Sequence, residues 1–167
     1  MNYNILVFNK QSLGVIDSNR LRSYLMEVHF DTLCDQYGLN PSLIGSARTN
    51  LDVAVSKAHK SPFFLINYGD ENGCPVIVYE SDFKSEREHH IHNEFLIADL
   101  SADIKLHLNS TNFLIEIELM EQQLSNMGLL LAYEAARWTA FKGGGIIFGL
   151  DRTWYRLNQH RAILPLE

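Results

Sequence analysis

Histidine and carboxylate side chains are concentrated between Glu86 and Glu94, in the sequence Glu-Arg-Glu-His-His-Ile-His-Asn-Glu. Imidazole and carboxylate groups together can bind zinc and other transition metals. In an extended chain, His90 and His92 would share one face and could both reach a metal ion. The candidate metal ligands are therefore His90, His92 and the nearby Glu88, and a metal-dependent hydrolase is the enzyme that this segment would support.

The same segment also has a simpler interpretation. Its spacing matches no defined zinc motif, and residues 81–94 are the most polar stretch of the chain, which is typical of an exposed connection. We therefore interpret the histidines as solvated loop residues whose titration near neutral pH could make the loop pH-sensitive. On this interpretation we expect no bound metal and no other cofactor.

A second group of candidate residues lies near the end of the chain: Arg152, Trp154, Tyr155 and Arg156. Aromatic residues and arginine are enriched at protein interfaces. In a strand, Trp154 and Arg156 share one face and Tyr155 points to the other. One interpretation is an interaction surface, at a sheet edge that a partner protein or a second copy of the chain could extend. The other is a core position for Trp154, with Arg156 at its rim.

The sequence contains none of the common catalytic or nucleotide-binding motifs: GxSxG, HExxH, GxxxxGK[ST] or GxGxxG. Gly143, Gly144 and Gly145 follow a predicted helix and do not open one, and no Lys-Ser/Thr comes after them. A glycine can adopt the left-handed conformation that ends a helix. We therefore interpret the three glycines as a helix cap and not as a phosphate-binding loop.

Composition restricts the class of protein. The chain has 167 residues, 46% of them hydrophobic, which suits one domain over residues 1–167 with a substantial core. Twenty acidic and 14 basic residues give a net charge of −6 without a Lys/Arg cluster, so we expect no nucleic-acid binding. No apolar run approaches a membrane span, and residues 1–8 do not resemble a secretion signal. We expect a cytoplasmic protein in which Cys34 and Cys74 are reduced core residues.

Two amphipathic helices should organise the chain. Apolar residues recur at spacings of three and four from Met120 to Trp138, which predicts one long helix that ends at the triple glycine. An earlier helix should begin at Asp17 or Ser18, either of which can cap it, and end at Gly38. Two residues on the apolar stripe of the later helix are expected to be buried against the sheet: Leu131 and Trp138.

Strands are predicted from alternating or continuous apolar runs at residues 5–8, 62–68, 75–80, 104–108, 113–119, 146–148 and 153–157, with a short edge strand at 95–98. Residues 50–57 fit either a strand or the end of a helix. Turn residues favour hairpins around 69–73, 109–112 and 149–152. Hairpins without strict strand–helix alternation predict an α+β fold: a mostly antiparallel sheet built from hairpins, with two long amphipathic helices packed on one face.

These features favour a small, acidic, cytoplasmic binding or interaction protein whose partner is another protein or a second copy of the chain. The immunity partner of a toxin is one concrete form of such a protein, because immunity proteins are often small, acidic and free of catalytic motifs. The alternative function is the metal-dependent hydrolase, with its site in residues 86–94.

Overall fold

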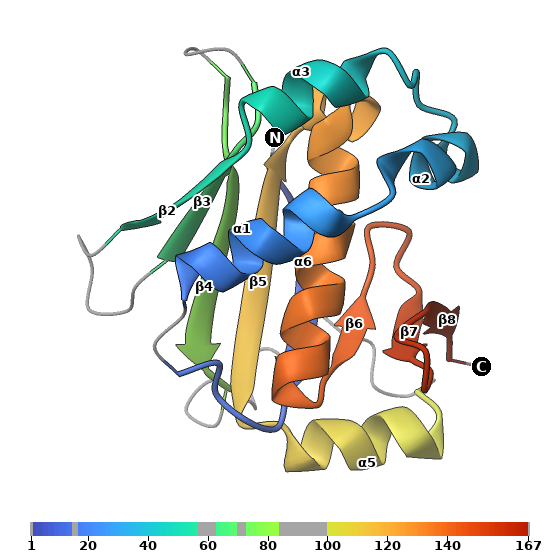
Figure 1. Cartoon of the computed structure of the whole chain (residues 1–167). Coiled ribbons are helices and arrows are strands. Elements are labelled where there is room, and N and C mark those ends of the chain that lie inside the picture. The colour runs from blue at the N-terminus through green and yellow to red at the C-terminus, as the bar shows by residue number, and fades with distance from the viewer. Residues whose placement is uncertain (1, 15–16, 57–62, 70–72, 84–99, 167) are drawn as a thin grey trace.

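The computed structural model of the chain describes residues 2–14, 17–56, 63–69, 73–83 and 100–166 (Figure 1). The helices are α1 Ser18–Glu27, α2 Phe30–Tyr37, α3 Leu43–Thr49, α5 Ala102–Ser110, α6 Met127–Gly143 and the 3₁₀ helix η2 Glu121–Ser125. The strands are β1 Asn2–Asn9, β2 Asp52–Ser56, β3 Phe63–Asn67, β4 Val76–Asp82, β5 Phe113–Met120, β6 Ile146–Phe148, β7 Trp154–Leu157 and β8 Ile163–Pro165.

The eight strands form one sheet in the order β2-β3-β4-β5-β1-β6-β7-β8. Every neighbouring pair is antiparallel. The predicted α+β class with an antiparallel sheet is therefore confirmed. In the described ranges, no helix has both the length and the apolar character needed to cross a membrane.

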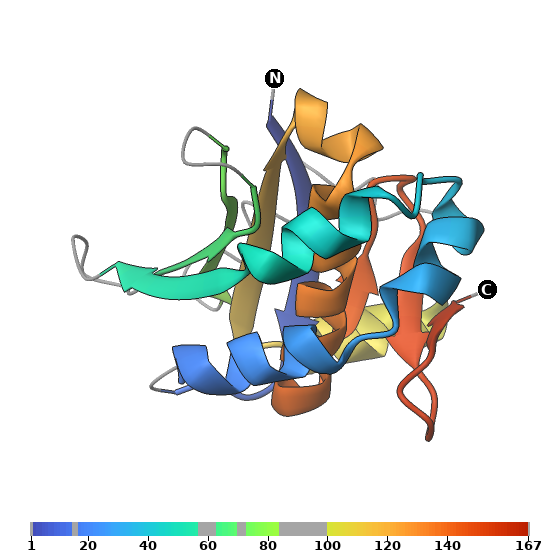
Figure 2. The ribbon, with the colours of Figure 1, turned by 45° about the horizontal axis from the view of Figure 1, so that its top comes forward.

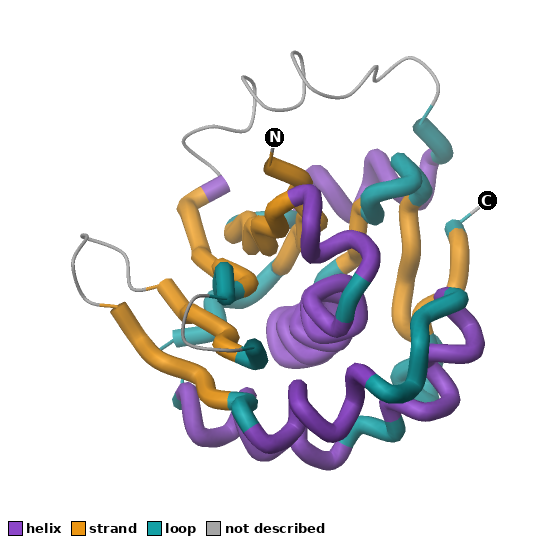
Figure 3. Tube along the Cα trace, turned by 90° about the horizontal axis from the view of Figure 1, so that it is seen from above, coloured by secondary structure: helices purple, strands orange, loops and turns teal. Residues whose placement is uncertain are grey.

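The sheet curves around helix α6. Figure 3 looks along α6 and shows strands on several sides of it, with α1, α2 and α3 closing the side that the sheet leaves open. Of the 17 residues of α6, 12 are buried. A helix that is apolar on most of its circumference must be surrounded to be stable in water. Helix α6 is therefore the centre of the fold.

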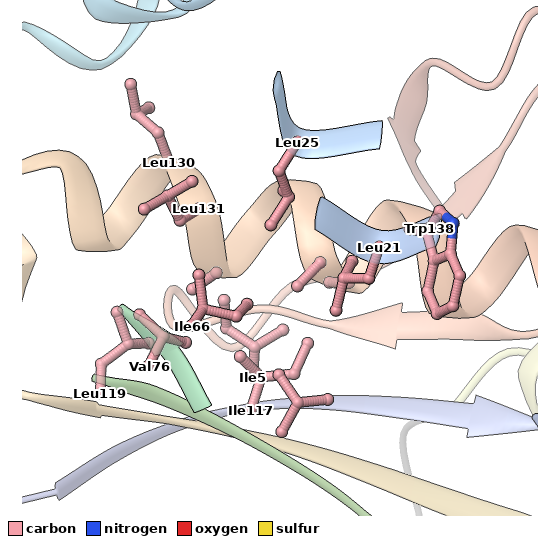
Figure 4. Close-up of a cluster of buried hydrophobic side chains, with 14 of the residues drawn as sticks. Ile5, Leu21, Leu25, Ile66, Val76, Ile117, Leu119, Leu130, Leu131 and Trp138 are labelled. Carbon is pink, nitrogen blue, oxygen red and sulfur yellow. The ribbon is translucent and has the colours of Figure 1, made fainter. Parts of the chain in front are cut away.

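The two faces of the sheet pack against different helices. Strand β1 directs Ile5 and Val7 toward α6, and directs Leu6 and Phe8 toward α5 on the opposite face. This alternation follows from the two-residue period of a strand, and it explains why β1 is buried on both sides. Figure 4 shows the larger cluster, in which side chains from α1, the sheet and α6 point toward one another.

The expectation of two long helices on one face is not met. Met120 belongs to β5, residues 121–125 form η2, and α6 begins only after Asn126, whose Oδ1 accepts a hydrogen bond from Gly128 N at 2.8 Å. The earlier helix is divided into α1 and α2 at Val28, whose carbonyl accepts a hydrogen bond from the Arg48 side chain at 2.7 Å. Val28 itself has an extended backbone, with φ of −67° and ψ of 135°, which ends α1.

The predicted strand at 104–108 is wrong, because these residues belong to α5. Ser101 caps the helix by accepting from Ile104 N at 3.4 Å. Ile104 and Leu108 are buried, whereas Leu106 is 70% exposed. Apolar residues at alternate positions fit a strand, but the outer two are also four residues apart and share one face of a helix. The strand that follows, β5, pairs with β1 and β4 instead.

The last strands differ from the prediction in one respect. Strand β7 pairs with β6 on one side and with β8 on the other, so neither strand of the predicted final hairpin is a sheet edge. The described sheet ends at β2 and β8. Residues 52–56, which fitted either a strand or a helix, form β2, and the predicted strand at 95–98 lies outside the described residues.

Several local predictions are confirmed. The Asp17 side chain caps α1 by accepting from two backbone N–H groups. Gly38 and Gly144 adopt the left-handed conformation at the ends of α2 and α6, with φ of 66° and 64°. Leu131 and Trp138 are 1% and 8% exposed. These features depend on short-range chemistry, which is why the sequence indicates them well.

Candidate functional site

A cleft of about 390 Å³ opens between α1, the C-terminal half of α6 and the turn that joins β7 to β8. We term it the basic cleft. Its lining consists of Asn19, Arg20, Ser23, Tyr24, Glu27, Arg137, Trp138, Phe141, Lys142 and Arg161. A flanking hollow of about 530 Å³ shares four of these residues with it: Tyr24, Glu27, Arg137 and Arg161.

Helix α1 supplies one wall of the cleft. Leu21 and Leu25 are fully buried and fix the orientation of this helix against the core (Figure 4). Arg20, Tyr24 and Glu27 follow one another at spacings of four and three, so they lie along a single side of the helix. Burial of the leucines therefore places a cation, a hydroxyl group and a carboxylate along this wall.

The turn between β7 and β8 supplies the opposite wall and extends beyond its strands, as Figure 2 shows. Its conformation is held by Asn158, whose Oδ1 accepts from His160 N at 2.8 Å and from Ala162 N at 2.9 Å. Arg161 has a φ of +61°, a conformation that is uncommon for a residue with a Cβ atom. Its guanidinium carbon lies 3.7 Å from the centroid of the Phe141 ring.

Two cations lie near this ring. The ammonium group of Lys142 lies 5.9 Å from the Phe141 centroid, and Phe141 itself is 44% exposed. In the described part of the chain, neither Arg161 nor Lys142 has a carboxylate within ion-pair distance. The left-handed backbone of Arg161 and the exposed ring of Phe141 are departures from the usual local structure, and the two solvent-exposed cations beside the ring are free to contact a ligand. Such departures from good local chemistry are concentrated at functional sites.

A buried carboxylate, Glu134, contacts two residues of the cleft and borders the flanking hollow. Glu134 is 3% exposed. Its Oε2 accepts from the Tyr24 hydroxyl at 2.8 Å, and its Oε1 lies 3.1 Å from Arg137 NH2. Burial raises the pKa of Glu134, which the Arg137 charge and the Tyr24 hydrogen bond oppose. Burial and the Glu134 charge also raise the pKa of Tyr24, so its hydroxyl is a hydrogen-bond donor at neutral pH. Glu134 therefore orients two of the side chains that line the cleft.

The four predicted interaction residues, Arg152, Trp154, Tyr155 and Arg156, lie outside the basic cleft. Trp154 is 7% exposed and packs against Phe8 and Phe148, which is the core position that was the second interpretation. Arg152 is exposed in the turn before β7, with a φ of +62°. Tyr155 is half-buried and donates a hydrogen bond to Asp151.

The fourth, Arg156, is exposed and lines a separate hollow of about 440 Å³ together with His107. None of the four lines the basic cleft. An interaction role for Arg152, Tyr155 and Arg156 stays a prediction.

The predicted metal ligands cannot be placed. His90, His92 and Glu88 lie outside the described residues, so metal binding at 86–94 stays a prediction. Within the described ranges, no group of three or more His, Cys, Asp or Glu residues could hold a metal ion. Cys34 is buried and Cys74 is half-buried, and both are free thiols.

The sequence analysis missed the basic cleft because its residues come from separate elements. One signal was present: Glu134 interrupts an otherwise apolar segment of α6, and a charged residue there needs a partner. No comparable signal marked Arg161, which lies in a short turn 20 residues after Phe141.

Comparisons with known proteins give no further guidance, because no protein-family model, curated protein or solved structure matched this chain.

Proposed function

We propose that this chain is a binding protein that takes an anionic segment of a partner protein in the basic cleft. The supporting observation is that Arg161 and Lys142, which have no carboxylate partner among the described residues, lie together in a cleft of a chain whose net charge is −6. A local excess of one charge sign on a protein of the other sign favours a ligand that complements the local charge.

The dimensions and composition of the cleft favour a protein segment over a nucleic acid. Four cationic residues line the cleft, whereas a nucleic acid would extend beyond it over a chain whose net charge is −6. The exposed ring of Phe141 and the edge of Trp138 offer apolar contact beside the charges. A short segment that combines anionic and apolar side chains can use both kinds of contact.

A toxin is one concrete partner of this kind, and self-association is another. Sedimentation of the purified chain distinguishes them. A concentration-dependent dimer that dissociates when Arg161 is replaced would indicate that the partner is a second copy.

The proposal is tested with a fluorescent decapeptide of Gly and Ser that carries two central glutamates, alongside peptides with two lysines or with no charge. Fluorescence anisotropy should show binding of the glutamate peptide alone, weakened by added salt. The Arg161→Gly variant should bind roughly tenfold more weakly, because a hydrogen bond to a charged group contributes about 1.5–3 kcal/mol. Glycine suits the left-handed backbone at this position, so the variant removes the guanidinium without strain.

Arg152→Gly makes the same chemical change in the other left-handed arginine. Comparing the two variants shows whether the peptide binds in the basic cleft or on the hairpin surface that the sequence indicated. Loss of peptide binding in Arg152→Gly, with normal binding in Arg161→Gly, would place the interaction on the hairpin and contradict the cleft proposal.

A further inference from the structure

The charge distribution in the basic cleft is uneven, and this unevenness bears on the kind of anion it takes. Arg137 is paired with the buried Glu134 at 3.1 Å, and Arg20 lies 3.4 Å from Asp17. The remaining cations, Arg161 and Lys142, are the two that face the Phe141 ring. The unpaired positive charge of the described cleft therefore lies beside one ring and amounts to two units.

The opposite side of the cleft discourages a long run of negative charges. Glu27 lines both the basic cleft and the flanking hollow, and the largely buried Glu134 borders the flanking hollow. A polyanionic segment that crossed from the Phe141 ring into the flanking hollow would meet these carboxylates. A single compact group with two negative charges would not.

The donors at the Phe141 ring suit a tetrahedral oxyanion. Among the described residues, the Arg161 guanidinium has no hydrogen-bond acceptor and is held in place by stacking on the ring. Its planar set of N–H donors can bind two oxygens of one phosphate, and the ammonium of Lys142 can bind a third as a point charge. The negative end of the α6 dipole lies close by and attracts cations, but it offers no anion to neutralise them.

We infer that the anionic group bound at Arg161, Lys142 and Phe141 is a phosphate monoester on a single phosphorylated residue of the partner segment. This inference rests on the proposed function. A phosphate monoester carries a charge of about −1.5 to −2 at pH 7, which matches two unpaired cations better than one carboxylate does. The unphosphorylated segment would leave both cations unpaired, so phosphorylation would control the interaction.

The test compares four fluorescent decapeptides that differ only at the centre: serine, phosphoserine, one glutamate or two glutamates. Anisotropy should show that the phosphoserine peptide binds at least tenfold more tightly than the two-glutamate peptide. Its advantage should decrease between about pH 7.5 and pH 5.5, because the phosphate takes up its second proton near pH 6.

Two variants of the full chain provide the structural control. Lys142→Gln should weaken binding of the phosphoserine peptide about tenfold. Lys105→Gln removes an exposed lysine of α5 that does not line the cleft, and it should leave binding unchanged. If both variants lost the same affinity for the phosphoserine peptide, the loss would come from the change in net charge alone, and the inference would be overturned.

The outcomes separate this inference from the proposed function. Equal affinity for the phosphoserine and two-glutamate peptides would overturn the phosphate assignment and leave the binding function in place. Failure of all four peptides to bind would overturn both. Binding of inorganic phosphate at a comparable concentration, without binding of any peptide, would show a free-anion site and would also contradict a partner segment.

Discussion

The two ends of α6 both carry clusters of polar and aromatic side chains, but the clusters differ in how well their polar groups are satisfied. At the N-terminal end, Gln123 accepts from Met120 N at 2.7 Å and donates to Cys74 O at 2.8 Å and to Tyr68 Oη at 3.2 Å. The Tyr68 hydroxyl in turn donates to Asn126 Oδ1 at 2.8 Å. Each of these side chains has its partners inside the chain.

At the C-terminal end, the charged groups have no such polar partners among the described residues. Arg161 and Lys142 lie beside the exposed ring of Phe141 with no carboxylate of the described chain to pair with. A satisfied polar cluster stabilises and specifies the fold, whereas an unsatisfied one has donors left for a ligand. One end of α6 is thus joined to the sheet by satisfied hydrogen bonds, and the other end is the one that we propose as the binding site.

The largest effect on stability is expected between these two ends, at the apolar middle of the helix. Leu131→Ala should lower the free energy of unfolding by roughly 2–5 kcal/mol, because it creates a cavity beside a residue that is 1% exposed. Urea unfolding measures the change. A loss below about 0.5 kcal/mol would mean that α6 is not the centre of the core.

The next largest effect is expected at the satisfied end. Gln123→Ala should cost about 1–3 kcal/mol, because it leaves a backbone N–H and a carbonyl without their buried partner. Peptide binding at the basic cleft should be unchanged after correction for folded protein. If binding fell and stability did not, the roles assigned to the two ends would be reversed.

A smaller, pH-dependent effect is expected at Glu134, which borders the flanking hollow. Burial raises the pKa of Glu134 above its ordinary value of 4.5. Below that value Glu134 is protonated in both the folded and the unfolded chain. As the pH rises, the unfolded chain loses the proton first, so the native chain should lose stability relative to Glu134→Gln. Urea unfolding of both proteins from about pH 4 to pH 7 tests this, and a constant difference would contradict it.

The smallest effect on stability is expected at Arg156, which is exposed on β7 outside the basic cleft. Arg156→Glu should change stability by no more than about 0.5 kcal/mol. The sequence-based hypothesis of a hairpin interface predicts that it weakens association, whereas the cleft hypothesis predicts no change. Thermal melting and peptide anisotropy on the same variant distinguish these outcomes and show whether binding is confined to one end of α6.

Features that depend on neighbouring residues were predictable from sequence. The cap at Asp17, the left-handed glycines at 38 and 144, and the apolar stripe through Leu131 and Trp138 all follow from local backbone chemistry and helical period. Residues 104–108 were mispredicted because their apolar spacing fits both a strand and a helix, and only packing against β1 and β5 selects the helix.

The amino-acid sequence by itself determined the α+β class, the identity of the central helix and the overall negative charge. Only the tertiary structure decided where the unpaired positive charge lies. Tyr24 and Glu134 are 110 residues apart, and Arg161 reaches Phe141 through a turn whose conformation depends on Asn158. Sequence periodicity describes one element at a time, whereas a binding site is made by elements whose relative positions are set by the burial of the core between them.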